Sequence, residues 1–174
     1  MKHFIMLIAY ILTVAAVLAI VSCKSTPPAP MAVIEALCAA EAMLPAGTAY
    51  SSDAPKGDKE YLPPALLFSA YGIPDGYVGI EKAAVRLSGN GHPTEFAVFL
   101  CKDAEYAEDV ALFCKNRLNA LSLNSAFSSD LAGISKEDYD RYLSSAAVII
   151  SGRYVALIIS SDVPAAKRAL IKAL

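Results

Sequence analysis

The sequence of 174 residues contains no tryptophan and only two histidines, and its charge is nearly balanced, with 15 basic and 17 acidic side chains. The lysines and arginines are scattered, so no basic patch predicts a nucleic-acid partner. His92 is the only histidine after residue 3, and a lone histidine without a second ligand nearby does not make a zinc site. No glycine-rich segment has the lysine and following helix of a phosphate loop. We therefore expect no nucleic acid, no metal and no cofactor.

A long apolar run opens the chain. Phe4 to Val21 follows the short basic start Met1-Lys2-His3 and holds almost no polar side chain. The run exceeds the core of a usual secretory signal and approaches the about 20 residues that cross a bilayer. Length alone therefore leaves an uncleaved membrane anchor open as an alternative.

The end of this run resembles the bacterial lipoprotein box. In Ile20-Val21-Ser22-Cys23 two aliphatic residues and a small one precede a cysteine, and a small residue lets a peptidase approach an extended backbone. The resemblance implies cleavage between Ser22 and Cys23 and attachment of diacylglycerol to the Cys23 thiol. Two acyl chains hold a protein stably on a membrane, whereas one binds marginally. We therefore expect membrane lipid as a partner through Cys23, on the extracytoplasmic face of the cell membrane.

A proline-rich tether follows the cysteine. Lys24 to Pro30 reads KSTPPAP, and closely spaced prolines favour an extended chain of about 3.1 Å per residue. The tether should hold a domain roughly 20 Å from the acylated cysteine. The expected organisation is a signal peptide over residues 1–22, the acylated cysteine and tether over 23–30, and a single domain over 31–174.

Hydrophobic periodicity predicts the elements of that domain. The expected helices cover residues 31–44, 65–71, 104–121, 135–143 and 165–174, with Asp103 and Asp162 as helix caps and a capping box at Ser135. The expected strands cover 77–87, 94–101, 147–150 and 154–160, and Gly152-Arg153 should turn the last two into a hairpin. Residues 48–64 carry several prolines and polar side chains, so they predict a loop with at most a short extended piece near Tyr50.

The order of these elements contains a weak internal repeat. Strand, strand and helix occur over residues 77–121 and again over 147–174, with FAVFLCKD and YVALIISSD before the two helices. Short hairpins make neighbouring strands antiparallel. We therefore predict an α+β fold with a four-stranded antiparallel sheet, in two strand-strand-helix units, with helices packed mainly on one face.

The remaining reactive side chains favour packing or solvation over chemistry. Cys38, Cys101 and Cys114 lie in apolar patterns and are expected to behave as small buried hydrophobes; Cys101 and Cys114 should lie too far apart to pair, and a partner for Cys38 stays open. His92 is expected to be an exposed loop residue. Nine acidic residues lack the spacing of a calcium loop: Asp53, Asp58, Glu60, Glu105, Glu108, Asp109, Glu137, Asp138 and Asp140. Of these, Glu105, Glu108 and Asp109 lie one turn apart on the expected polar face of a helix and predict a solvated face. No catalytic residue is predicted.

Several stretches resemble a known family. Besides the lipoprotein box, these are Tyr71-Gly72-Ile73, the strand EFAVFLCKD at residues 95–103 and ISGRYVALIISSD at residues 150–162. They are similar to the domain of unknown function 4358 (DUF4358) family of small bacterial lipoproteins. The resemblance implies a location and a fold, and it implies no particular activity.

Anchor, tether and the lack of a catalytic set together favour a non-enzymatic binding or accessory module of the cell envelope, with an envelope protein or ligand as its partner. An envelope hydrolase with an unrecognised active site is the alternative from another class. A deep pocket with convergent side chains of perturbed pKa would favour that alternative.

Overall fold

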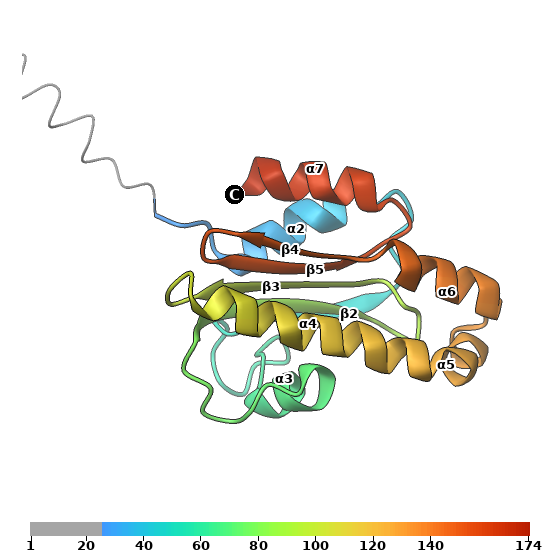
Figure 1. Ribbon diagram of the computed structural model, residues 1–174, viewed down its shortest axis with the longest axis horizontal. Helices are drawn as coiled ribbons and strands as arrows, with labels where there is room; N and C mark the ends of the chain where they lie inside the picture. Colours follow the sequence, from blue (N-terminus) through green and yellow to red (C-terminus); the bar gives the residue numbers. More distant parts are fainter. Residues whose placement is uncertain (1–25) are drawn as a thin grey trace, which may run out of the picture.

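The computed structural model describes residues 26–174 as a five-stranded antiparallel sheet with helices on both faces (Figure 1). The predicted signal peptide and the residues Ser22 and Cys23 lie outside the described residues. The strands occur in the order β1-β2-β3-β5-β4 and have these bounds: β1 Gly47–Ser51, β2 Ile80–Ser88, β3 Glu95–Cys101, β4 Ala147–Ser151 and β5 Tyr154–Ile159. The helices are α2 Pro30–Ala40, α3 Pro64–Tyr71, α4 Tyr106–Leu123, α5 Ser125–Ala132, α6 Lys136–Ser145 and α7 Val163–Ala173.

The central strand β3 is buried along its whole length. It pairs with β2 on one side and β5 on the other. Successive side chains of a strand point to opposite faces, and here Phe99 packs into one apolar cluster whereas Phe96 and Val98 pack into another. Because both faces of β3 are apolar, each face of the sheet needs its own layer of helices.

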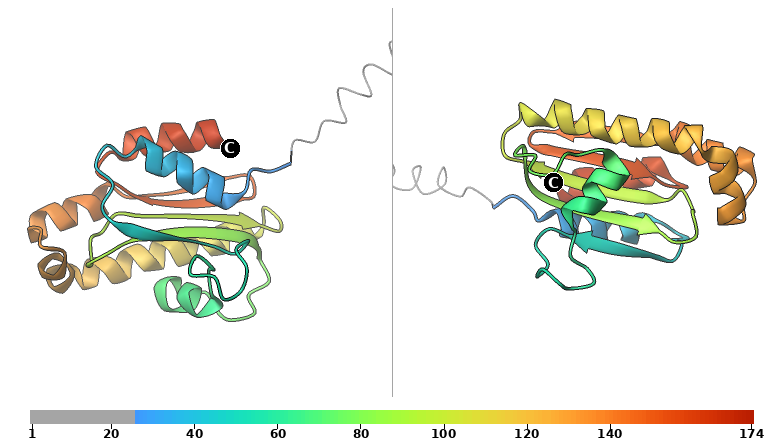
Figure 2. Two further views of the ribbon diagram at one scale, coloured as in Figure 1. Left: turned by 180° about the vertical axis from the view of Figure 1, so that it is seen from behind. Right: turned by 90° about the horizontal axis from the view of Figure 1, so that it is seen from below.

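The helices occupy both faces of the sheet, so the prediction of helices mainly on one face is wrong. Helices α2 and α7 share one cluster with the sheet, and α3, α4 and α6 share the other; the two layers are separated by the sheet in Figures 1 and 2. The physical reason is the composition of β3 and β5, in which every residue is buried. The α+β class and the antiparallel pairing are confirmed.

The fifth strand, β1, is a second correction, because only four strands were predicted and residues 48–64 were expected to be a loop with at most a short extended piece near Tyr50. Its residues, GTAYS, are small or polar and only its last residue is buried, so they give little strand signal. Tertiary pairing forms the strand: Gly47 lies opposite Ser88 and Ser51 opposite Ala84 in an antiparallel register. The sheet thereby gains a free edge next to α2.

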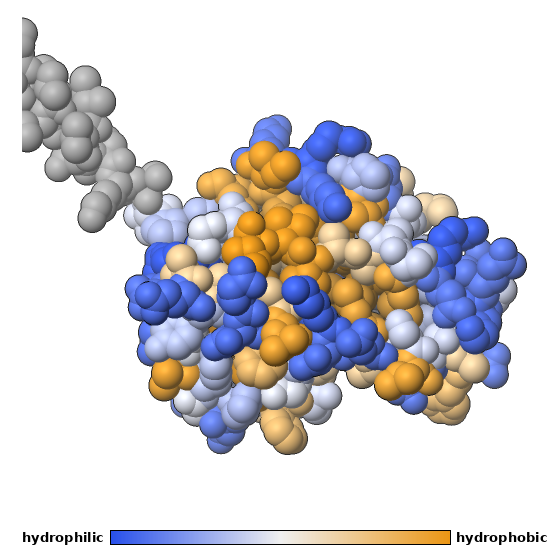
Figure 3. All heavy atoms as spheres, in the orientation of Figure 1, coloured by the Kyte–Doolittle hydropathy of each residue, from blue (hydrophilic) through white to orange (hydrophobic). Residues whose placement is uncertain are grey.

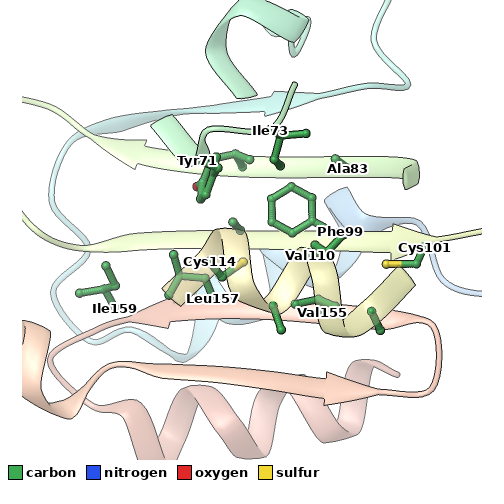
Figure 4. Packing of buried hydrophobic residues seen from close by; sticks show 14 of the residues in the cluster. Tyr71, Ile73, Ala83, Phe99, Cys101, Val110, Cys114, Val155, Leu157 and Ile159 are labelled. Atoms are coloured by element: carbon green, nitrogen blue, oxygen red, sulfur yellow. The ribbon is translucent and has the colours of Figure 1, made fainter. Parts of the chain in front are cut away.

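Helix α4 provides much of the apolar cover on its side of the sheet. Val110 and Cys114 lie over the sheet close to Phe99 and Leu157 in Figure 4. The helix begins at Tyr106 with Glu105 as its N-terminal flanking residue. Asp103 was expected to cap it, but Asp103 instead accepts a turn hydrogen bond from the Tyr106 N–H through its own backbone carbonyl.

Two other predicted caps are confirmed. The Ser135 hydroxyl accepts a hydrogen bond from the Asp138 N–H at 3.0 Å, and the Asp162 carboxylate accepts one from the Ala165 N–H at 2.9 Å. The hairpin between β4 and β5 is also confirmed, and Gly152 adopts φ +57° in its two-residue turn. Within residues 26–174, no helix is both long enough and apolar enough to cross a membrane.

β1 and β2 approach each other closely at Gly47. A Cβ atom there would lie 2.9 Å from the Ser88 Cα and closer still to the Leu87 carbonyl oxygen. We expect Gly47→Ala to lower the free energy of unfolding by about 1–3 kcal/mol, as overpacking does. Urea unfolding checks this, with Gly89→Ala as the control, because a Cβ at Gly89 meets only the Ala46 carbonyl at 3.6 Å. Equal stability of the two variants would contradict the close approach.

Candidate functional site

A cleft of about 600 Å³ lies between helix α2 and the edge strand β1. We call it the α2–β1 cleft. Its volume is within the range of about 300–1,000 Å³ that small-ligand sites occupy. Its walls come from α2, from β1 and from the loop before α3, and its lining residues are Met31, Ile34, Glu35, Cys38, Gly47, Thr48, Ala49, Lys59, Glu60 and Arg86.

Arg86 is the unusual residue of this cleft, because its side chain is charged and only 5% exposed. It projects from β2 to the α2 face of the sheet. Its guanidinium donates to the Ser88 hydroxyl at 3.2 Å and to the carbonyl oxygen of Pro45. Among residues 26–174 no carboxylate lies within ion-pair distance of Arg86. Glu35 and Glu60 also line the cleft, but neither lies within ion-pair distance of Arg86. A buried cation without an ion-pair partner is costly, so a carboxylate that reaches the guanidinium would be favoured there.

A second, partly buried arginine has the carboxylate that Arg86 lacks. Arg117 of α4 donates to Glu95 at the start of β3, from Nη2 at 2.8 Å and from Nε at 3.2 Å. The Tyr71 hydroxyl at the end of α3 donates to the other oxygen of Glu95 at 2.6 Å. Burial works against the Arg117 cation, but the charge and hydrogen bonds of Glu95 outweigh it and raise the pKa of Arg117. Burial and the Glu95 carboxylate raise the pKa of Tyr71 well above its usual value.

The side chains of Tyr71, Glu95 and Arg117 join α3, β3 and α4, so their main role is structural. The Glu95 carboxylate is 3% exposed, and its two oxygens are occupied by Tyr71 and Arg117. A hollow of about 160 Å³ borders this pair, between the loop before β3 and helix α4. Because both oxygens of Glu95 already accept internal hydrogen bonds, the arrangement leaves no free base for acid–base chemistry.

A polar cluster lies at the C-terminal end of α2, the opposite end of that helix from the tether. Glu41, which is 8% exposed, accepts hydrogen bonds from the hydroxyls of Ser160 and Ser161. Ser160 also accepts from the Asp162 N–H at 3.0 Å. These bonds join the end of α2 to the connection between β5 and α7. The cluster was not predicted from the sequence, where Glu41 is only an acid in the first expected helix.

His92 lies near this cluster and is half-buried, so the expectation of an exposed loop residue is wrong. Its Nδ1 accepts from the Thr94 N–H at 3.2 Å, and its ring meets Tyr142 edge-on with 5.3 Å between centroids. Burial lowers the pKa of His92, and the Glu41 charge partly opposes this. No hydrogen bond in the described chain links His92 to Ser160 or Ser161, so these residues do not form a nucleophile and base pair.

The three cysteines occupy different surroundings. Cys101 and Cys114 are fully buried, as predicted, and Cys38 is partly buried on the cleft wall. All three are free thiols. Burial raises the pKa of each thiol, to about 11 for Cys101, and at Cys38 the Arg86 charge opposes the effect of burial.

The acidic residues that were expected on solvated faces lie there. Glu105, Glu108 and Asp109 are exposed at the start of α4, and the acidic residues Asp53, Asp58 and Glu60 of the loop before α3 are exposed as well. Several acids form surface ion pairs, such as Asp53 with Lys82 at 3.1 Å. The described residues contain no group of three or more histidine, cysteine or acidic side chains that could hold a metal ion.

No family model, no curated protein and no solved structure matches this chain.

The ion pair between the buried Glu95 and the partly buried Arg117 supplies a test of the packing around the site. We expect Arg117→Met to lower the free energy of unfolding by about 3–5 kcal/mol, because the Glu95 carboxylate is left buried without its partner. The double variant Glu95→Gln with Arg117→Met should recover part of that loss. Chemical unfolding measures both, and Arg141→Met, which removes an ion pair at a largely exposed arginine, should cost at most about 1 kcal/mol. Equal losses at Arg117 and Arg141 would contradict the buried geometry.

The cysteines supply a second test through their rates of alkylation. The thiolate is the reactive form, and a raised pKa leaves less thiolate at pH 8. We expect Cys38 to react first in the folded protein, because it lies at the cleft surface, and Cys101 and Cys114 to react only on unfolding. Mass mapping after maleimide labelling checks the order, and Cys38→Ser should remove the fast reaction. Fast labelling of Cys101 in the folded protein would contradict the burial of that thiol.

Proposed function

We propose that this protein is a membrane-anchored lipoprotein on the extracytoplasmic face of the cell, and that its domain is a non-enzymatic module that binds an envelope partner. The observation that carries the proposal is the lipoprotein box Ile20 to Cys23, followed at once by the proline-rich tether. A diacylglycerol-modified cysteine supplies two acyl chains, which is enough for stable membrane attachment. The resemblance of the chain to the DUF4358 family of small bacterial lipoproteins also supports this proposal.

The contacts of the tether support this arrangement. The Tyr154 hydroxyl donates to the Pro28 carbonyl at 2.6 Å, which joins the described end of the tether to the hairpin between β4 and β5. The chain leaves the domain at this end in Figure 1. With Cys23 a few residues before Pro28, this end would face the membrane, and the cluster around Glu41 would face away from it.

The α2–β1 cleft supports a binding role for the domain. It combines apolar side chains from α2, an accessible strand edge and the buried Arg86 cation. The buried polar groups at Glu95 and Glu41 have their hydrogen bonds filled by internal partners. Binding through the cleft is therefore the function that the chemistry of the side chains favours over a hydrolytic reaction.

Mass spectrometry of the protein isolated from membranes tests the anchor. We expect a chain that begins at Cys23 and carries the added mass of the acyl groups. Cys23→Ala should abolish the acylation and leave the signal peptide uncleaved. Recovery of unmodified chain beginning at Met1 from membranes of the unaltered strain, with Cys23→Ala making no difference, would sink the lipoprotein proposal and favour the uncleaved anchor.

A count of thiols in denaturant provides an independent control. The full chain has four cysteines, and a thioether at Cys23 removes one of them from the count. The unaltered membrane protein and the Cys23→Ala variant should therefore give the same number of reactive thiols. One additional thiol in the unaltered protein would contradict acylation at Cys23.

A further inference from the structure

We propose that the free edge of β1 in the α2–β1 cleft binds an extended polypeptide segment by strand addition, with a carboxylate of that segment on Arg86. The inference rests on the proposed binding function and names the chemistry of the partner. Strand addition uses backbone hydrogen bonds for affinity and side-chain contacts for specificity. The β1 edge has free backbone groups for such hydrogen bonds and cleft side chains for such contacts.

The backbone groups of Gly47 and Ala49 point away from the sheet. Along a paired strand, alternate residues direct their N–H and C=O groups to opposite sides. The Ser52 N–H donates to Ala83 of β2, and the Ala46 carbonyl accepts from Gly89, so the even-numbered residues face β2. Gly47 and Ala49 therefore face the cleft. In the described chain their N–H and C=O groups have no backbone or side-chain partner on that side.

The same edge already binds one extended segment of this chain. The Ser51 N–H donates to the Glu60 carbonyl at 2.8 Å, and the Leu62 N–H donates to the Ser51 carbonyl at 3.0 Å. These two bonds form a parallel bridge between Ser51 and Tyr61. The loop before α3 thus pairs with the last residue of β1 and leaves the first part of the strand open. The right view of Figure 2 shows β1 as the outermost strand on this side of the sheet.

Arg86 explains why the partner should carry a carboxylate. Its guanidinium lies next to Gly47, where a Cβ atom would meet Nη2 at 3.0 Å. An extended chain on Gly47 and Ala49 would therefore pass close to a buried cation that has no carboxylate partner among residues 26–174. Charge-assisted bonds between arginine and a carboxylate are stronger than neutral ones. Either an acidic side chain or a chain terminus could supply this group.

The shape of the cleft favours a single strand over a second copy of this protein. The open edge lies between α2 on one side and Lys59 and Glu60 on the other. In a second copy the β1 edge is flanked by the same two segments. If two such edges approached each other, these flanking segments would collide before the strands could pair. The opposite edge strand, β4, differs in chemistry. Its exposed side includes Ile150, and apolar surface over β4 is visible in Figure 3, without a buried cation beside it.

Binding of defined peptide pools to the full-length protein in detergent micelles tests the inference. The probes are N-acetylated, C-terminally amidated peptides with random residues around one fixed glutamate, and a matched pool with glutamine in its place. A third pool has no fixed acid but a free C-terminal carboxylate. We expect peptides selected from the glutamate or free-carboxylate pool to bind about tenfold or more tightly than their neutral counterparts, and the pool that succeeds identifies the source of the carboxylate. Equal affinity of charged and neutral peptides would overturn the role of Arg86.

Hydrogen exchange locates the binding edge without any substitution. Bound peptide should slow amide exchange in residues 47–51 and leave exchange in β4 unchanged. Ala49→Pro removes an outward N–H and spares the bonds to β2, and proline is tolerated on the free side of an edge strand. We expect this variant to lose peptide binding. Ile150→Pro is the matched control on β4, where the hairpin register places the Ile150 N–H outward, and it should bind as the unaltered protein does.

Other results would overturn the inference in distinct ways. Protection outside residues 47–51, or unchanged binding by a folded Ala49→Pro variant, would place the partner elsewhere. A concentration-dependent dimer in ultracentrifugation, abolished by Ala49→Pro, would make the occupant a second copy. If cross-linking in intact cells captures an envelope component equally with the unaltered protein and Ala49→Pro, the strand-addition inference fails while the proposed envelope binding function stands.

Discussion

The burial of β3 on both faces is the constraint on which the rest of the structure depends. A strand whose seven residues are all buried needs neighbours on both edges and cover on both faces, since apolar surface left in water costs about 25 cal/mol per Å². The neighbours are β2 and β5, and the cover comes from α2 and α7 on one face and from α3, α4 and α6 on the other. The Glu95 carboxylate at the beginning of this strand is buried as well, and it requires both Arg117 and Tyr71.

Two arginines, the buried Arg86 and the partly buried Arg117, therefore have opposite roles. Arg117 is neutralised within the domain by Glu95, and that pair joins α4 to the central strand. Arg86 has only neutral acceptors, the Ser88 hydroxyl and a backbone carbonyl. The charge of Arg117 is therefore balanced by an internal ion pair. The charge of Arg86 stays unbalanced at the edge of the α2–β1 cleft, next to the free backbone groups of β1. The proposed binding site combines this charge with that strand edge.

The sequence predicted the elements with strong apolar periodicity and failed where the pattern is weak or inverted. β3 and β5 are apolar runs, and their positions were predicted to within a residue or two. β1 has small and polar residues, and pairing with β2 makes it a strand. Helix α5 was missed because its buried residues include Ser125 and Ser129, whereas Phe127 is 73% exposed. Local pattern could not reveal that orientation, since it depends on the packing of α5 against α6 and α4.

The functional features also differ in how far the sequence alone could predict them. The sequence by itself determined the proposed anchor, because the lipoprotein box and the prolines are contiguous and need no folding to be recognised. It also determined the antiparallel α+β class through its hairpins and apolar strands. Only the tertiary structure placed Arg86 beside Gly47 and left Ala49 at an open edge, because Arg86 follows these two residues of β1 by 39 and 37 positions in the chain. Whether an arginine has a carboxylate partner depends on which helix packs over it. That arrangement follows from the packing of helices on both sides of β3.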